Sequence, residues 1–389
     1  MSEYQYYEFV AIDTPLTPKQ MAELRARSSR ASITPTSFVN DYQWGNLKGD
    51  PADWMRCYFD AHVYVANWCT CLLYLRVPKN VFDAELLRGF KTQTVFSVEQ
   101  TKTHWLLGWE LNESDNYDRF AEEDGRGWMG RLVPLRDELL RGDMRPLYLG
   151  WLAGVSAGEV DEQAIEPQPP PGLSRLTAAQ QSLAEFLEID EDLLAAAGLS
   201  DQQDLKPDSE SGAERDVWIA ALPAAEKTET LKLLLCGNAQ QAERELKLRF
   251  LAWQREQRPV AKPETRRRTV AELHELAASA AKARKRQEAV RRKRAEAERQ
   301  AKRETYLRTL AADFDRCWQA ADKLAERGIA SAYDEVKRAL VDLSDAYALC
   351  ATRADFERKL VQFMARHEKR GALVRRLADA GLWKKSWQR

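Results

Sequence analysis

The chain has 389 residues, of which 44% are apolar, 9% aromatic and 31% charged, with a formal net charge of −1. This length and composition suit buried cores in about two or three domains, and they exclude a wholly disordered chain, a collagen-like repeat and a disulfide-dense small protein. No apolar run approaches the ~20 residues of a membrane span, and residues 1–9 lack the apolar core of a signal peptide. The six cysteines have no regular spacing, which is typical of reduced thiols, so we expect a cytoplasmic protein without a membrane partner.

Charge is distributed unevenly along the chain. Residues 1–165 and residues 166–261 each carry a net charge of −7, whereas residues 262–304 carry +8 and residues 305–389 carry +5. The acidic front and the basic back can neutralise each other or bind separate partners. Solvated charged faces that bind nothing are an equally good interpretation.

Residues 1–157 predict an α+β domain in which helices pack on a mixed sheet. Aromatic and β-branched residues predict strands at 4–13, 33–42, 69–76, 95–100 and 104–110. Capping residues and prolines predict helices that begin near Thr17, Asp50 and Pro134. Pro35 makes the second strand an edge or bent segment, and apolar residues on both sides of 69–76 indicate a central strand.

Residues 158–176 predict a linker, because the run E-P-Q-P-P-P-G at 166–172 favours a stiff extended spacer. Residues 177–261 then predict a helical domain, whose first helix is capped by Thr177 and ended by Gly198. We expect this all-α region to continue to the end of the chain.

Residues 262–304 predict a basic helical arm. There is neither Gly nor Pro from Glu264 to Arg327, so a long helix can form there, and the apolar residues from Lys282 to Glu304 are too small to dock firmly. From Tyr306 a full apolar face begins, and residues 305–389 predict a C-terminal helical bundle.

The arm is the first candidate binding site. Its cations are Arg284, Lys285, Arg286, Arg291, Arg292, Lys293 and Arg294. Such a helix can neutralise nucleic-acid phosphates or bind an acidic protein, although stacking on single strands is not supported because residues 266–304 contain no Phe, Tyr or Trp. Interspersed glutamates are also typical of a solvated spacer or a weak coiled coil.

Two further clusters contain residue types that carry chemistry. Cys57, His62, Cys69 and Cys71 are metal-ligand types, but their spacing is not that of a zinc knuckle, and small buried core residues are the simpler interpretation. His104 with Glu99 and Glu110, beside the acidic loop 112–130, suits acid–base work or a bound cation, whereas a solvated loop is simpler.

No phosphate-binding loop, dinucleotide fingerprint or nucleophile elbow is present. We therefore assign no catalytic residue and expect neither a metal nor a cofactor.

Several runs of sequence together resemble an uncharacterised family of bacterial proteins. These runs lie at 6–17, 28–45, 136–152, 183–197 and 366–382. The C-terminal end alone is similar to the tail of some SWIM-type zinc-finger proteins, whose zinc ligands have no counterpart here. The resemblance implies a bacterial cytoplasmic protein and, because the family has no assigned activity, it supplies no site residues.

The charge distribution and the lack of a compact catalytic motif predict an interaction or adaptor protein whose arm binds a macromolecule, with a protein partner expected first. Two alternatives stay open: nucleic-acid binding through the basic helix, and an enzyme with an acid–base or metal site in the N-terminal domain.

Overall fold

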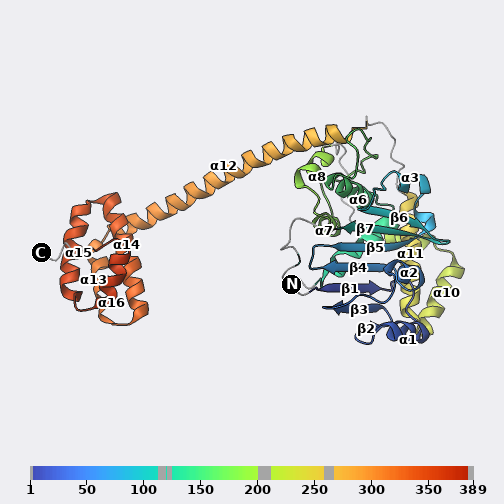
Figure 1. Cartoon of the computed structure of the whole chain (residues 1–389), viewed down its shortest axis with the longest axis horizontal. Coiled ribbons are helices and arrows are strands. Elements are labelled where there is room, and N and C mark those ends of the chain that lie inside the picture. The colour runs from blue at the N-terminus through green and yellow to red at the C-terminus, as the bar shows by residue number, and fades with distance from the viewer. Residues whose placement is uncertain (1–2, 113–119, 121–124, 200–211, 258–266, 384–389) are drawn as a thin grey trace. The chain divides into compact units, whose positions relative to one another are not determined.

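The computed structural model describes residues 3–112, 120, 125–199, 212–257 and 267–383 (Figure 1). The chain divides into two compact units, Met1–Ala283 and Arg284–Arg389, which we call unit 1 and unit 2. Unit 1 combines a sheet with helices and unit 2 is helical, so the predicted order of an α+β part followed by an all-α part is confirmed.

Unit 1 is built on a seven-stranded sheet with the strand order β2-β3-β1-β4-β5-β7-β6. The strands are β1 (Gln5–Val10), β2 (Ser32–Thr34), β3 (Ser37–Tyr42), β4 (Ala61–Ala66), β5 (Cys71–Pro78), β6 (Phe96–Gln100) and β7 (His104–Leu111). Every strand pair is antiparallel, so the sheet is not mixed as expected. Tight turns join β2 to β3, β4 to β5 and β6 to β7, and such turns can connect only antiparallel strands.

The sequence missed two features of this sheet. Residues 61–66 form β4, which is not among the strands that the sequence predicts. Residues 33–42 form a hairpin of β2 and β3 around Pro35, because proline cannot donate to a strand ladder. The predicted central strand is confirmed, since β5 lies between β4 and β7.

Helices cover both faces of the sheet. On one face α1 (Pro18–Arg27) and α2 (Pro51–Cys57) contribute Leu24, Trp54 and Met55 to a core that includes Phe9 and Phe38. The helices of the larger core on the other face are α4 (Trp128–Leu132), α5 (Pro134–Leu140), α6 (Arg145–Ser156), α7 (Ala178–Phe186) and α8 (Glu191–Gly198). A short 3-10 turn η1 (Lys79–Val81) and helix α3 (Ala84–Arg88) lie between β5 and β6 along the chain.

A glycine allows α6 to approach the sheet closely. A Cβ atom at Gly150 would lie 2.7 Å from Nε1 of Trp109 and 2.8 Å from Cδ2 of Phe96. The first turn of α6 is also held against the sheet, because Nε1 of Trp109 donates to the carbonyl of Pro146 at 3.0 Å. The apolar stretch that follows Arg145 is therefore a buried helix rather than a strand.

The proline-rich segment 158–176 does not separate two packed units. Glu166 and Leu173 are buried, and the backbone of this segment pairs with residues 268–270, where the N–H of Glu166 donates to the carbonyl of Arg268 at 2.8 Å. Helices α7 and α8 belong to the same core as the sheet. The proline-rich segment is therefore packed as part of unit 1, and the packing boundary falls at residues 283–284 instead.

Three helices complete this part of unit 1: α9 (Gly212–Ala221), α10 (Ala224–Leu235) and α11 (Ala239–Gln257). Leu251 of α11 is buried in the larger core, and Lys247 forms a 2.6 Å ion pair with Asp137 of α5.

Unit 2 has a core of its own. Unit 2 contains the C-terminal part of α12 (Val270–Ala311), and its core is formed by the helices that follow: α13 (Phe314–Glu326), α14 (Ala330–Cys350), α15 (Arg353–His367) and α16 (Gly371–Asp379). The Gly- and Pro-free run breaks after Ala311, because the carboxylate of Asp313 caps α13 by accepting from the N–H of Arg316 at 2.9 Å. Ion pairs join alternate helices, with Lys359 to Asp315 at 2.8 Å and Arg376 to Asp334 at 2.7 Å.

Candidate functional site

Helix α12 begins within the structure of unit 1. Thr269 caps it reciprocally: the N–H of Glu272 donates to the Thr269 hydroxyl at 3.2 Å, and the Glu272 carboxylate accepts from the N–H of Thr269 at 2.9 Å. Val270 and Leu273 are fully buried in the larger core. This end of the helix is therefore fixed by capping and by burial.

A buried ion pair reinforces this attachment. Nε and Nη2 of Arg268 donate to the carboxylate of Glu166 at 2.7 and 2.8 Å, and the hydroxyl of Tyr148 donates to the same carboxylate. Burial raises the pKa of Tyr148 above its ordinary value, so the hydroxyl stays protonated and remains a donor. The guanidinium of Arg268 is used internally, although it lies in the predicted basic arm.

The middle of α12 has a different environment. Every residue from 284 to 302 is exposed, and we call these residues the basic stretch. They include nine Lys or Arg and three Glu. All seven predicted binding residues lie here, and two pairs at i,i+4 support the helix, Arg284–Glu288 at 3.1 Å and Lys302–Glu298 at 2.8 Å.

The remaining cations of the basic stretch have no ion pair with a carboxylate among the described residues of the chain. They are Lys285, Arg286, Arg291, Arg292, Lys293, Arg294 and Arg299. The four residues 291–294 are consecutive, so their side chains project about 100° apart and surround the helix. The apolar residues of the stretch are alanines and Val290, of whose surface 67% is exposed.

At its other end α12 packs against α14 of unit 2. Arg303 forms ion pairs with Asp342 at 2.6 Å and Asp345 at 2.9 Å on α14, and the hydrogen bonds that it donates to these carboxylates raise the pKa of Arg303. Leu307 is buried. The cations that lie at the two ends of the helix therefore serve packing, whereas those of the basic stretch do not.

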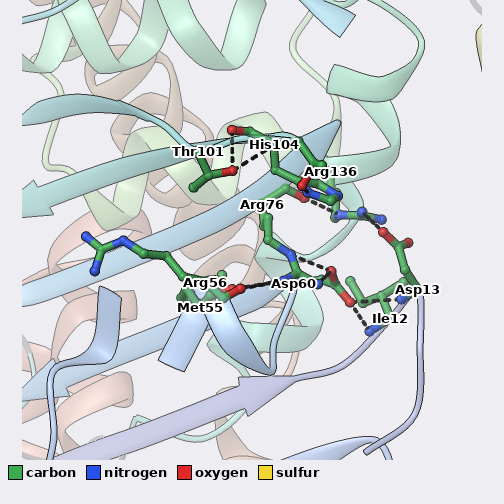
Figure 2. A network of polar contacts seen from close by, with 10 residues as sticks. Ile12, Asp13, Met55, Arg56, Asp60, Arg76, Thr101, His104 and Arg136 are labelled. Atoms are coloured by element: carbon green, nitrogen blue, oxygen red, sulfur yellow. Dashed lines mark hydrogen bonds and ion pairs between the residues drawn. The ribbon is translucent and has the colours of Figure 1, made fainter. Parts of the chain in front are cut away.

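A second cluster of charged groups lies at one end of the sheet (Figure 2). Only 1% of the Asp60 side chain is exposed. Its Oδ2 accepts from the N–H groups of Ile12 and Asp13 at 2.7 and 2.8 Å, and its Oδ1 accepts from Nε and Nη2 of Arg76 at 3.0 and 2.6 Å. Arg136 of α5 donates to Asp13 at 2.6 Å and to the carbonyl of Arg76 at 2.7 Å.

This network is closed on itself. Both oxygens of Asp60 and the guanidinium groups of Arg76 and Arg136 take part in these hydrogen bonds. Figure 2 shows that they link side chains and backbone groups that are far apart in the sequence. Buried charges that are paired in this way hold a structure together, and removing one partner is strongly destabilising. The cluster therefore fixes this end of the sheet.

His104 lies beside this network, whereas Glu110 does not. In the register of β5 and β7, His104 is opposite Pro78 and Glu110 is opposite Leu72, so the two side chains are separated by about 20 Å of strand. Burial and the charge of Arg76 lower the pKa of His104. His104 and Glu110 are therefore too far apart to act together as an acid–base pair, and most of the acidic loop (113–119 and 121–124) lies outside the described residues.

The predicted cysteine–histidine cluster is also dispersed. His62 faces the α1/α2 side of the sheet, where it stacks on Phe9, whereas Cys71 faces the other side and its thiol lies 3.0 Å from the carbonyl of Phe186. Cys57 is exposed at the end of α2 and Cys69 is buried in a turn. In the described part of the chain no three His, Cys, Asp or Glu residues are placed to hold a metal ion.

Sequence reasoning missed the Asp60 network. The available signal was Arg76, a single charged residue inside the apolar strand β5, whereas Arg136 stands beside two other charged residues in α5 and gave no such signal. Such residues are buried only when they have partners, but the partners of Arg76 and Arg136, which are Asp60 and Asp13, are 16 and 123 residues away.

Comparison of the chain with protein-family models, with curated proteins and with solved structures gives no match. The resemblance to an uncharacterised bacterial family therefore stays a prediction. Among the described residues, no helix is both long and apolar enough to cross a bilayer.

Proposed function

We propose that the chain is an interaction protein that binds an anionic macromolecule through the basic stretch of α12. One observation carries the proposal: seven exposed cations within residues 284–302 have no carboxylate partner in the described structure. By contrast, Arg268, which lies just before this helix, and Arg303, which lies on it, are paired with buried or half-buried carboxylates. The unpaired cations are not needed for packing and are available to a ligand.

The shape of the surface supports recognition by charge. Protein partners that grip a helix usually take apolar anchors spaced at i, i+3, i+4 and i+7. The basic stretch offers only alanines and Val290, so an apolar groove on a partner has little to hold. Closely spaced cations instead favour an extended anion and fast, salt-dependent association.

The experiment measures binding of fluorescein-labelled heparin to the full chain at several salt concentrations. The test variant replaces Arg291, Arg292, Lys293 and Arg294 with Gln, which keeps a good helix former at each position. The matched control replaces four exposed cations of unit 1 with Gln and so changes the net charge equally. These control residues are Lys19, Arg88, Lys91 and Lys102.

We expect the wild-type chain to bind heparin at low salt and to lose affinity steeply as salt rises. The test variant should bind at least about 10-fold more weakly and the control within about 2-fold of wild type, because only the former removes cations of the basic stretch. Equal loss in both variants, or no binding by the wild type at low salt, would show that the basic stretch is not the binding surface.

A further inference from the structure

We infer that the anionic partner is a nucleic-acid duplex, which the basic stretch contacts along both phosphate backbones without reading the sequence. This inference rests on the proposed function and names the partner of the same surface. Three properties of residues 284–302 carry it: the angular distribution of the cations, the width of the helix, and the side chains that the stretch lacks.

Cations surround the helix rather than lining one face. Arg291, Arg292, Lys293 and Arg294 are consecutive in a continuous helix, so they point in directions about 100° apart. A flat acidic surface, such as that of a folded protein, can contact only the side of the helix that faces it. A groove between two phosphate backbones places anions on opposite sides of the helix, and it can therefore use cations that point in opposite directions.

The dimensions of the stretch fit such a groove. Its 19 residues extend over ~28 Å at about 1.5 Å per residue, which corresponds to about eight base pairs of B-form DNA. An α-helix with its side chains is about 10–12 Å wide, and the major groove is about 12 Å wide. Five of the residues are alanines at 289, 295, 297 and 301 and valine at 290, which keep the helix slim between its charged side chains.

The stretch lacks the side chains that single strands require. Residues 284–302 contain no Phe, Tyr, Trp or His, so no aromatic ring is available for unpaired bases to stack on. Lys and Arg contacts to phosphates position a protein on a duplex but carry no sequence information. We therefore expect preference for duplex over single strand and little preference among duplex sequences.

The test compares three labelled probes on the full chain by fluorescence anisotropy: a duplex of about 24 base pairs, a single strand with the same total number of phosphates, and poly-L-glutamate. We expect the duplex to bind at least about 10-fold more tightly than either other probe, and a second duplex of unrelated sequence to bind within about 2-fold. The slope of log affinity against log salt should fall in magnitude by about 3–4 when residues 291–294 are changed to Gln, since each neutralised phosphate contributes about 0.9.

The Lys19, Arg88, Lys91 and Lys102 variant is again the matched control and should keep the wild-type slope. Equal affinity for duplex and single strand, or tighter binding of poly-L-glutamate, would overturn the duplex inference while the heparin result leaves the proposed function in place. If the variant changed at residues 291–294 bound heparin as tightly as the control variant does, the proposed function itself would be wrong. The two failures are therefore distinguishable.

Discussion

At the residue scale, His62 is the clearest case of a titratable group that the fold keeps neutral. Its ring stacks on Phe9 with centroids 3.8 Å apart, and its Nδ1 lies 3.0 Å from the carbonyl of Glu8. Nε2 is buried without a hydrogen-bond partner in the described structure. Complete burial lowers the pKa of His62 from 6.5 to about 3, so the imidazole serves as a flat core side chain.

This burial predicts a specific dependence of stability on pH. Below pH 6.5 the unfolded chain binds a proton at His62 whereas the folded chain does not until about pH 3. As the pH is lowered from 6.5 towards 3, protonation of His62 in the unfolded chain should therefore lower the free energy of unfolding by up to about 1.4 kcal/mol per pH unit. His62→Phe keeps an aromatic ring on Phe9 and should remove this contribution, which urea unfolding at pH 7, 6, 5 and 4 would measure.

Phe38→Leu in the same core offers a control, since it removes no titratable group and should keep the wild-type dependence of unfolding on pH. If His62→Phe lost stability between pH 6.5 and 4 as steeply as the wild type, some other group would be responsible for the acid sensitivity.

At the scale of the element, α12 is one helix in three environments. Its first turns are buried in the core of unit 1, its middle is exposed, and its last turns pack in unit 2. A helix with charged residues on all sides gains little from packing and is supported in water by i,i+4 pairs. The middle of α12 is therefore exposed on every side, and only at its two ends does burial depend on the side of the helix.

Two substitutions on this helix should have very different effects. Leu273 is fully buried, whereas 67% of Val290 is exposed. Leu273→Ala should lower the free energy of unfolding of unit 1 by about 2–5 kcal/mol, because it leaves a cavity in the core. Val290→Ala should change it by no more than about 0.5 kcal/mol. Chemical denaturation followed by circular dichroism would compare them, and similar losses in both variants would contradict the burial of this end of α12.

At the scale of the whole molecule, the net charge of −1 conceals two units of opposite sign. Unit 1 has 44 acidic and 32 basic residues, a net charge of −12, and unit 2 has 16 acidic and 27 basic residues, a net charge of +11. A polyanion should therefore be repelled by unit 1 and attracted by unit 2. Binding that is confined to the basic stretch agrees with this separation of charge.

The cores of the two units share no described residue, so we expect them to open independently. Leu360 is fully buried in unit 2, and Leu360→Ala should cost that unit about 2–5 kcal/mol. Amide hydrogen exchange of the full chain would measure this as faster exchange in α13 to α16, with β4 and β5 unchanged. Equal acceleration in β4 and β5 would indicate that the units unfold together.

Much of the candidate site could be predicted from the sequence, because its signals are local. A run of residues without Gly or Pro favours a helix, and the absence of large apolar side chains between residues 284 and 302 indicates exposure. The limits of the exposed part could not be predicted. Arg268 and Arg303 look like the other cations of the arm, and only contacts with Glu166 and Asp342, far away along the chain, distinguish them.

Most helices, most strands and the basic surface of α12 follow from local sequence, since capping residues, alternation and charge act within a few neighbouring residues. The pairing of Glu166 with Arg268, the separation of His104 from Glu110 along one strand and the contact of Asp60 with Arg76 do not follow from it. These outcomes depend on strand register and on packing between distant segments. Such contacts become favourable only when the whole sheet and its covering helices have assembled.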